Sequence, residues 1–597
     1  PATLHTIQEQ VTWRRLADGE RLFHQGELGT SMFIVVNGRL QVVLERDESG
    51  GLERDLGEIG PGETTGEYAL LTDEIRSASV YAIRDTDVVE LTRPIFERLI
   101  EAHPQAMVEI ARIIITRQKR ALRPLSTRAA SHRLTALSIA IFPAGRDGAP
   151  LADFAASLAE SLSVFGPTAL FTGERFDDAF GKPGAALTEP DDALSLVLNH
   201  WLQQQESDFR HILYVADAEW TAWGRRCLAQ ADRVLLVGMA GGNPGPGPLE
   251  SYCAPRLRKE LVLLYAPDAA EPSGTRAWLE PREEAAGVDA AGVGAASLVH
   301  HHVRQGDRAH WERLARRLTG RAVGMAFSGG AARGFAHVGV IRALEEAGQP
   351  VDYIGGSSMG ALVGGGWAMG LTPAQGMERA ARIANPGYLL DRTFPYTAVM
   401  ASRKITLALR EMFGERQIED LWRPFFCVST NLSAAAPVIH DRGPLWRAVR
   451  ASISLPGIFS PILNEKNELL VDGGVMNNFP VDILAARAEF GLIIGSNVSP
   501  HREQPYPYPL GESVSGWRVL WSYANPFGQR LPAPRLGSII LRTVEVNSLY
   551  HRKSVEQLVD ILIEPDVRDF NFLDFEAYET MERRGYEAAR QALEDRG

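Results

Sequence analysis

Short apolar runs separated by turn residues dominate residues 15–92. The runs "MFIVVNGRLQVVLER" and "SASVYAIRDTDVVELT" are rich in β-branched residues, and glycines stand in turn-like settings at Gly26, Gly38, Gly60 and Gly62. This pattern predicts a small antiparallel β-roll. From residue 93 to about 123 apolar positions recur at steps of three and four residues, which predicts helix. The basic end of this segment has two interpretations, contact with anionic lipid or a solvated helix face.

From about residue 134 to 284, apolar strand-like runs alternate with helical segments. The runs include "ALSIAIFP", "HILYVAD", "DRVLLVG" and "LVLLYAP". Strict alternation predicts a parallel, Rossmann-like sheet covered by helices on both faces. The loop "FPAGRDGAP" has neither G-x-G-x-x-G nor a P-loop lysine, which argues against a nucleotide site. The Ala/Gly-rich piece "EEAAGVDAAGVGAAS" predicts a flexible surface loop before the last domain.

Residues 324–347 read as a buried strand, a glycine-rich turn and an amphipathic helix. This order places free backbone N–H groups at a helix N-terminus, where they can stabilise an oxyanion that forms when an ester is attacked. A plain glycine turn is the competing interpretation. The candidate oxyanion loop comprises Gly329, Gly330, Ala331, Arg333 and Gly334, with Arg333 adding positive charge.

A second stretch, "VDYIGGSSMGALVGG", places Ser358 between Gly356 and Gly360. Gly-x-Ser-x-Gly is the pattern of a tight strand-to-helix elbow that exposes a nucleophilic serine. The flanking sequence supports this interpretation, because an apolar strand precedes Ser358 and a helical segment follows it. Further along, "ELLVDGGVMNNFP" ends an apolar strand at Asp472, and Gly473 and Gly474 force a turn. A carboxylate in that position can accept a serine proton directly.

The motifs "SGGAARG", "GGSSMGA" and "LLVDGGVMNNFP", in this order, resemble the patatin-like phospholipase domain. The pieces "FGERQIEDLWRPFFCVSTNL", "RASISLPGIFSPI" and "FLDFEAYETMERRGYEAARQAL" are similar to its neuropathy target esterase branch, so that the resemblance covers roughly 310–590. It implies a Ser–Asp dyad at Ser358 and Asp472 and an oxyanion hole in the loop 329–334. It also implies phospholipid or lysophospholipid esters as substrates, without a required cofactor or metal.

The chain departs from the family at Ala331, where a third consecutive glycine is usual. If this position needs a positive φ angle, alanine would cost about 1 kcal/mol or more and could misaim a donor. A Ser–Asp–His triad is the alternative constellation, with His501 or His551 following Asp472 in α/β-hydrolase order. His337, in the helix after the glycine loop, is expected to pack against the site or tune it.

Residues 66–80, "GEYALLTDEIRSASV", resemble the phosphate-binding cassette of cyclic-nucleotide-binding domains. The resemblance implies cAMP or cGMP as a regulatory ligand, with Arg76 pairing with the cyclic phosphate and Glu67 accepting from the ribose hydroxyl. Such rolls can also persist without a ligand. Thr65 replaces the bulkier apolar residue often found there, which leaves affinity open. The remaining cassette positions are Gly66, Ala69, Ser77 and Ser79.

Composition narrows the class of protein. A chain of 597 residues suggests about three or four domains. The net charge of −12 argues against a nucleic-acid polymer as partner. Three scattered cysteines (Cys227, Cys253 and Cys427) are expected to be buried thiols in a reducing compartment. Adjacent His300, His301 and His302 alternate in direction on a strand, so they do not predict a metal site.

The chain shows no membrane-spanning run and no signal peptide, so we expect a cytoplasmic protein that associates peripherally with membranes; it begins without Met, so an upstream segment could be missing. The aromatic and basic stretch 516–536 is interpreted as a lid, a membrane-contact loop or core, on the strength of Trp517, Arg518, Trp521, Tyr523, Phe527 and Arg530.

The predicted architecture is a multidomain α/β protein. It comprises a cyclic-nucleotide-binding-like β-roll with helices (1–125), a middle Rossmann-like α/β domain (126–305) and a patatin-like α/β/α domain (306–597). The expected function is ester hydrolysis regulated through the roll, with helix 93–123 as transmitter. The rival hypothesis is a cyclic-nucleotide receptor whose hydrolase domain is feeble.

Overall fold

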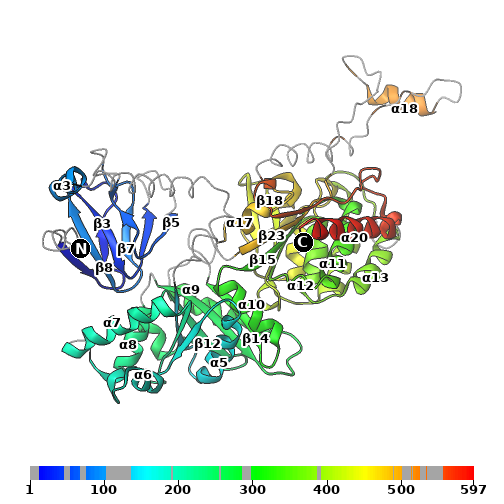
Figure 1. Cartoon of the computed structure of the whole chain (residues 1–597). Coiled ribbons are helices and arrows are strands. Elements are labelled where there is room, and N and C mark those ends of the chain that lie inside the picture. The colour runs from blue at the N-terminus through cyan, green and yellow to red at the C-terminus, as the bar shows by residue number, and fades with distance from the viewer. Residues whose placement is uncertain are drawn as a thin grey trace. The chain divides into compact units, whose positions relative to one another are not determined.

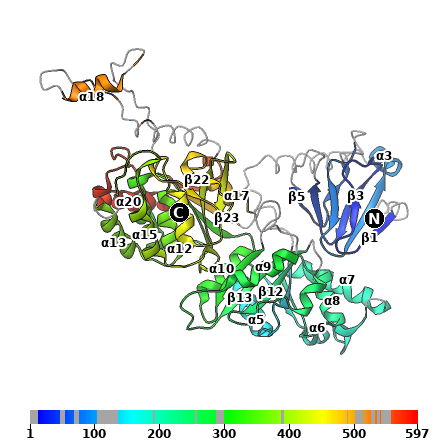
Figure 2. The ribbon, with the colours of Figure 1, turned by 180° about the vertical axis from the view of Figure 1, so that it is seen from behind.

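The computed structural model describes most of the chain, and its described residues form two compact units, one up to residue 319 and the other from residue 320. The residues described are 12–45, 54–67, 75–102, 136–189, 192–253, 257–285, 298–385, 391–487, 490–499, 515–524 and 555–596, with the single positions 513, 531, 533 and 539. Most of the expected helix 93–123 therefore lies outside them. Figures 1 and 2 show the modules from opposite sides.

The amino-terminal module is a roll of two antiparallel four-stranded sheets, drawn in blue in Figure 1. One sheet has the order β1-β8-β3-β6 and the other β2-β7-β4-β5. Apolar side chains that alternate along the strands, such as Phe33 and Val35, meet between the sheets. The strands are β1 (Thr12–Leu16), β2 (Arg21–Phe23), β3 (Ser31–Asn37), β4 (Leu40–Leu44), β5 (Arg54–Ile59), β6 (Thr64–Thr65), β7 (Ser79–Ala82) and β8 (Thr86–Thr92), followed by helix α3 (Arg93–Ala102).

The middle module is a parallel six-stranded sheet with the order β10-β11-β9-β12-β13-β14. Helices α5 and α10 cover one face, where Phe154 and Trp311 pack 5.4 Å apart between ring centroids. The strands are β9 (Leu137–Pro143), β10 (Thr168–Phe171), β11 (His211–Val215), β12 (Arg233–Met239), β13 (Arg258–Tyr265) and β14 (Val299–Arg304). The helices are α5 (Leu151–Ser163), α6 (Gly173–Phe180), α7 (Ala193–Asp208), α8 (Ala222–Gln230), α9 (Thr275–Ala285) and α10 (Arg308–Leu318).

Two buried arginines of the roll form ion pairs with carboxylates of the middle module within the same compact unit. Arg84 donates to Glu206 at 2.6 Å and lies 3.5 Å from Asp232. Arg39 lies 3.2 Å from the same Asp232. The surrounding carboxylates outweigh the cost of burial and raise the pKa of Arg84 above its ordinary value. Removing one partner would leave a buried charge uncompensated.

The carboxyl-terminal module is built on an eight-stranded sheet whose central strands are parallel. Its order is β21-β22-β18-β16-β15-β23-β24, and β19 pairs with β18. The strands are β15 (Ala322–Phe327), β16 (Tyr353–Ser357), β18 (Phe425–Asn431), β19 (Ala436–His440), β21 (Ile462–Leu463), β22 (Leu469–Asp472), β23 (Phe490–Ser496) and β24 (Ile561–Ile563), and a separate pair is formed by β17 (Ala398–Met400) and β20 (Gly457–Phe459).

Helices cover both faces of this sheet, because alternate residues of its strands are apolar on each side. Met325 and Phe327 pack with the helices of one face, whereas Ala322 and Ala326 pack with α17 on the other. The first face carries α11 (Ala336–Glu346), α12 (Met359–Ala368), α15 (Arg403–Phe413), α16 (Leu445–Ser452) and α20 (Tyr578–Glu594); the second carries α17 (Val481–Ala485). The predicted fold class, a multidomain α/β protein with an amino-terminal roll, is confirmed.

Candidate active site

Ser358 occupies a sharp turn between strand β16 and helix α12. Its backbone angles are φ 53° and ψ −121°, an unfavourable region for a residue with a Cβ atom. A Cβ atom on Gly356 would lie 2.5 Å from the carbonyl oxygen of Gly360, and one on Gly360 would overlap the carbonyl of Phe327. Both glycines are therefore required for the close approach of the strand and the helix, and the turn aims the serine at the end of the sheet.

Asp472 lies beside this serine at the end of strand β22. The Oγ atom of Ser358 donates to Oδ2 of Asp472 at 2.7 Å, and Oδ1 accepts from the backbone N–H of Gly474 at 2.7 Å. A Cβ atom on Gly473 would overlap the carbonyl of Val428, so this turn also needs a glycine. Burial raises the pKa of Asp472 to about 7, although the bonds from Ser358 and Gly474 act in the opposite direction.

A second serine fixes the backbone of the nucleophile. The N–H of Ser358 donates to Oγ of Ser452 at 2.9 Å, and that hydroxyl donates to the carbonyl of Val428 at 2.6 Å. Ser452 ends helix α16, in a segment that the sequence associates with the family without assigning a role to this residue. The contact between them spans 94 positions of the chain, so no local sequence pattern indicates it.

The glycine-rich loop lies directly against the nucleophile. A Cβ atom on Gly329 would be 2.9 Å from Cβ of Ser358. The backbone N–H groups of Gly330 and Ala331 have no hydrogen-bond acceptor among the described residues, whereas that of Ala332 donates to the carbonyl of Phe572 at 3.1 Å. Two adjacent donors thus remain open next to Ser358, at the start of the short 3-10 helix η5 (Ala331–Phe335).

Ala331 has a φ angle of 49°. This is the left-handed region that a Cβ atom disfavours by roughly 1–2 kcal/mol. The sequence predicts strain if position 331 needs a positive φ angle. The position does have a positive φ, so alanine is strained there.

Arg333 and Gly334 complete the loop in different ways. The Nε atom of Arg333 donates to the carbonyl of Phe570 at 2.9 Å, and its guanidinium lies 4.6 Å from the ring centroid of Phe572. These contacts hold the segment 570–572 against the loop. Gly334 lies against the side chain of Met359, which leaves no space for a Cβ atom.

His337 is fully buried beneath the loop. Its Nε2 atom lies 2.9 Å from the carbonyl oxygen of Ser328 and its Nδ1 atom 2.8 Å from Oγ of Ser496. Because a carbonyl only accepts, Nε2 carries the proton and Nδ1 accepts from the serine hydroxyl. Burial lowers the pKa of His337 to about 4, so the ring is neutral near pH 7. The expectation that this histidine packs against or tunes the site agrees with this geometry.

Asn478 and Ser499 also hold the loop, and sequence reasoning assigned them no role. The N–H of Gly329 donates to the carbonyl of Asn478 at 3.0 Å, and Oγ of Ser499 donates to the carbonyl of Gly329 at 3.1 Å. Asn478 belongs to the same "DGGVMNNFP" stretch as Asp472. Its presence in that motif was the sequence feature that could have indicated a role in the site.

Models of known protein families match three stretches of the chain. The model described as patatin-like phospholipase matches residues 325–485, which include the elbow, the glycine loop and Asp472. The chain contains a patatin-like phospholipase domain. A neuropathy target esterase family P-loop like domain matches residues 136–287, and a cyclic nucleotide-binding domain matches residues 13–103. The resemblances stated from the sequence are confirmed for the amino-terminal roll and the carboxyl-terminal module.

Three curated relatives match over almost the whole chain. Patatin-like phospholipase domain-containing protein 7 of Mus musculus is 32% identical, covering 98% of this chain and 46% of the relative. Patatin-like phospholipase domain-containing protein 6 of Homo sapiens is 31% identical, covering 97% and 44%. Lysophospholipase nte1 of Neosartorya fischeri is 30% identical, covering 100% and 42%. The chain thus spans less than half the length of these curated relatives.

The cyclic nucleotide-binding domain gathers two of the predicted cassette residues in its interior. Arg76 and Glu67 are both buried, and Arg76 donates to the carbonyls of Ser31 and Gly66 at 2.6 and 2.9 Å. Burial lowers the pKa of Arg76, opposed by the charges of nearby glutamates that include Glu67. Ser79 accepts from the N–H of Gln25, Ser77 is exposed, and Ala69 lies outside the described residues.

In the P-loop like domain, a carboxylate of the protein occupies backbone donors of the loops that follow strands β9 and β12. The N–H groups of Gly145 and Gly247 donate to Oε1 of Glu250 at 3.0 and 2.7 Å, and Arg282 pairs with the same carboxylate at 2.7 Å. Donors that could cradle a phosphate are thus already used, in agreement with a loop that lacks the P-loop lysine.

The remaining candidates have other environments. His301 lies 2.8 Å from Glu260, His302 lies 2.9 Å from Thr275, and the described residues contain no group of His, Cys, Asp or Glu placed to hold a metal ion. His501, His551 and Phe527 lie outside the described residues, so the triad alternative stays a hypothesis. The three cysteines are buried and free, as predicted. None of the described helices has the length and apolarity needed to cross a membrane.

Proposed function

We propose that the patatin-like domain hydrolyses the carboxylic ester of lysophospholipids or phospholipids through a dyad of Ser358 and Asp472. The observation that carries this proposal is the 2.7 Å hydrogen bond from Ser358 to a buried carboxylate whose pKa is raised to about 7. A base with this pKa is poised to take a proton near neutral pH. The relatives named as phospholipases and as a lysophospholipase support the substrate class.

In the first half of the reaction, Oγ of Ser358 attacks the ester carbonyl as its proton passes to Oδ2 of Asp472. The carbonyl oxygen becomes an oxyanion that accepts from the N–H groups of Gly330 and Ala331. When the tetrahedral intermediate collapses, the C–O bond to the glycerol breaks and Asp472 returns the proton to the leaving alkoxide. In the second half, Asp472 takes a proton from water, the hydroxide attacks the acyl group on Ser358, and Ser358 regains its proton as the fatty acid leaves.

A fluorophosphonate that labels nucleophilic serines tests the assignment directly. We expect labelling of the wild-type chain at Ser358, none in Ser358→Ala, and strongly slowed labelling in Asp472→Asn, with loss of lysophospholipid hydrolysis in both variants. Because the two groups act as a unit, the double variant should lose no more activity than either single one. Near-normal turnover by a folded single variant would contradict the dyad. Product analysis by mass spectrometry identifies the head group and the acyl position.

The rival hypothesis, a receptor with a feeble hydrolase domain, is motivated by the strained φ angle of Ala331. A misaimed donor in the oxyanion hole typically lowers kcat by about 10²–10³-fold. Slow labelling of Ser358 together with slow turnover would favour this rival, because phosphonylation uses the same oxyanion donors, whereas strong labelling and rapid turnover favour the enzyme.

We further propose that cAMP or cGMP binds the roll through Arg76 and Glu67. The buried position of both residues carries this proposal. Binding would require the guanidinium of Arg76 to exchange a backbone carbonyl for the cyclic phosphate, which is a stronger, charge-assisted acceptor. Calorimetric titration of both nucleotides into the wild type and Arg76→Ala tests binding, and parallel hydrolysis assays test regulation. Absence of heat in the wild type would make the roll a structural module.

A further inference from the structure

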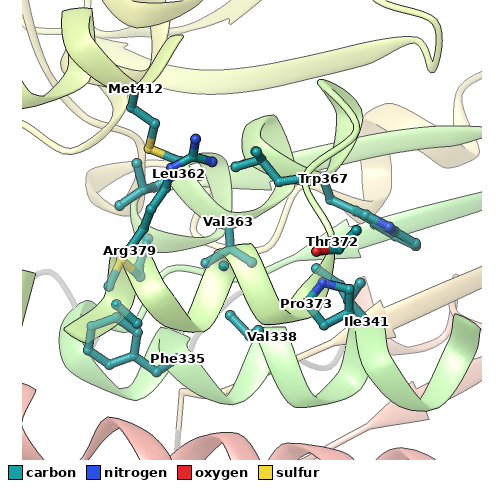
Figure 3. A pocket seen from close by; sticks show the side chains of 15 residues that line it. Phe335, Val338, Ile341, Leu362, Val363, Trp367, Thr372, Pro373, Arg379 and Met412 are labelled. Carbon is teal, nitrogen blue, oxygen red and sulfur yellow. The ribbon is translucent and has the colours of Figure 1, made fainter. Parts of the chain in front are cut away.

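A narrow apolar pocket lies on the outer side of helix α12, between α11, α13 (Pro373–Ala384) and α15 (Figure 3). Its cavity volume is about 50 Å³, and its lining is almost entirely apolar. Helix α12 contributes Met359, Leu362, Val363 and Trp367, which share one face at the spacing of a helix. The opposite face of this helix packs on the sheet through its small residues, such as Gly364.

The lining of the pocket includes the residue that follows the nucleophile. Met359 directly follows Ser358, and its side chain fills the space where a Cβ atom on Gly334 of the oxyanion loop would lie. Phe335, the last residue of η5, lines the same end. Helix α12 rises about 12 Å from Met359 to Trp367, so the pocket leads away from Ser358 over that length.

Arg379 is the charged exception in the lining. Its Nη1 atom is buried and has no hydrogen-bond partner among the described residues. Figure 3 places its side chain at the end where Phe335, Leu362 and Met412 lie, away from Thr372 and Pro373. Burial lowers the pKa of Arg379, the nearby carboxylate of Glu378 acts in the opposite direction, and the positive charges of Arg382 and Arg416 lower it further. A buried cationic nitrogen without an acceptor is costly, and an anion placed there would remove the cost.

We propose that this pocket binds the acyl chain of the ester substrate and that Arg379 binds the phosphate of its head group. The proposal rests on the proposed function of Ser358. It joins two observations: an apolar pocket whose lining includes the residue after the nucleophile, and a guanidinium at the same end whose buried Nη1 atom has no hydrogen-bond partner among the described residues. At about 50 Å³ the pocket is smaller than an acyl chain, so binding requires it to widen, which the flexible side chains of Met359 and Met412 allow. Room for a single chain favours a lipid with one acyl group. The substrate class is therefore an anionic lysophospholipid.

Blocking the pocket tests whether it is the binding site of the acyl chain. A Cβ atom on Gly376 would lie 3.4 Å from Val338, an ordinary contact, so Gly376→Ala is the control and Gly376→Leu the blocking variant. For Gly376→Leu we expect the ratio of kcat/KM for palmitoyl over butyryl esters to fall at least tenfold, with the control within twofold of the wild type. A folded Gly376→Leu protein with the wild-type ratio overturns the acyl assignment.

Neutralising the cation tests the head group. We expect Arg379→Met to lower the selectivity for lysophosphatidic acid over the neutral monoacylglycerol of the same chain at least tenfold, mainly through KM. Arg590→Met is the matched control, because Arg590 pairs with Glu594 on helix α20 and does not line the pocket. Unchanged selectivity in Arg379→Met overturns the assignment. Inorganic phosphate is the other probe: wild-type inhibition by phosphate that Arg379→Met leaves intact would place the phosphate site elsewhere and also contradict it.

Two measurements keep the inference separate from the proposed function. If the wild type hydrolyses neither palmitoyl nor butyryl ester, the proposed function fails, whatever the variants do. If Gly376→Leu does not fold, a lysophosphatidic acid with a diazirine on its acyl chain can be crosslinked to the Ser358→Ala protein. Crosslinks on α12 or α13 support the pocket, and crosslinks confined to other elements overturn it.

Discussion

The hydroxyl of Ser358 and the carboxylate of Asp472 form a 2.7 Å hydrogen bond in a site where their exposed fractions are only 6% and 1%. The same burial that shields the pair from water raises the pKa of Asp472 to about 7. The raised pKa of Asp472 predicts two effects of pH, one on the rate of hydrolysis and one on the stability of the fold.

Hydrolysis should depend on the ionisation of Asp472, because only the carboxylate can accept the serine proton. With a pKa near 7, we expect kcat/KM for a neutral ester to fall about tenfold for each pH unit below 7 and to level off above it. A pH profile measured with a monoacylglycerol checks this, since that substrate does not titrate in the range. A profile that stays flat from pH 5 to 8 would assign the proton transfer to another group.

Asp472→Asn should be inactive but more stable than the wild type above pH 7. The folded pKa of Asp472 lies above its ordinary value of 3.8, so the stability it contributes is present below about pH 4 and is lost as the pH rises through 7. A shift of this size corresponds to at most roughly 4 kcal/mol. Denaturant unfolding at pH 8 should favour the variant, and the difference should shrink towards pH 4. A variant that is less stable at pH 8 would contradict the raised pKa.

Ala331→Gly should relieve the strain at φ 49°. We expect the free energy of unfolding to rise by up to about 1 kcal/mol and turnover to increase or stay unchanged, because glycine accepts this conformation and lets the two loop donors align. Thermal unfolding and lysophospholipid assays check both effects, with Ala332→Gly in the same loop as control. A large fall in turnover would show that the methyl group itself helps to shape the loop.

His337→Gln should impair the oxyanion loop without removing a group that touches the substrate. Glutamine cannot reproduce the two opposed bonds to Ser328 and Ser496, so we expect kcat to fall at least tenfold with little change in KM. Ser496→Ala, which removes one partner only, should have a smaller effect. If kcat falls only in proportion to the fraction of folded protein, His337 contributes to packing and does not position the loop.

Helix α18 (Gly516–Ala524) should contribute to binding at a lipid surface. Its side chains of Trp517, Trp521 and Tyr523 are 81%, 74% and 58% exposed, an arrangement suited to an interface. We expect Trp517→Ser with Trp521→Ser to weaken binding to anionic vesicles at least several-fold in sedimentation assays, and Ser522→Ala to serve as control. Unchanged binding by the folded double variant would remove this helix from the interface.

The sequence predicted the parts of the site that depend on local geometry. Gly356, Ser358 and Gly360 belong to a turn whose backbone geometry depends on five consecutive residues. A local sequence motif was therefore enough to predict their roles. The strand that ends at Asp472 was visible for the same reason.

Contacts between distant segments were not predictable in this way. Ser452, which fixes the nucleophile, meets it through the packing of α16 on the sheet. His337 was recognised as a neighbour of the site, but its partner Ser496 lies 159 positions away and depends on the order of the strands. The value of φ at Ala331 likewise depends on the surroundings of the loop and not on its own residues.

The oxyanion loop is fastened by a segment that the ribosome makes near the end of this chain. Phe570 and Phe572 offer their carbonyls to Arg333 and Ala332, and Phe335 packs edge-on against Phe575 and Tyr578. Helix α20 then crosses α11 where Gly585 meets the backbone of Ala336. A nascent chain in which Ser358 has already been synthesised would still lack the segment from Phe570 to helix α20 that holds the loop. A loop held in this way is complete only after more than two hundred further residues have been made, since Phe570 follows Arg333 by 237 positions.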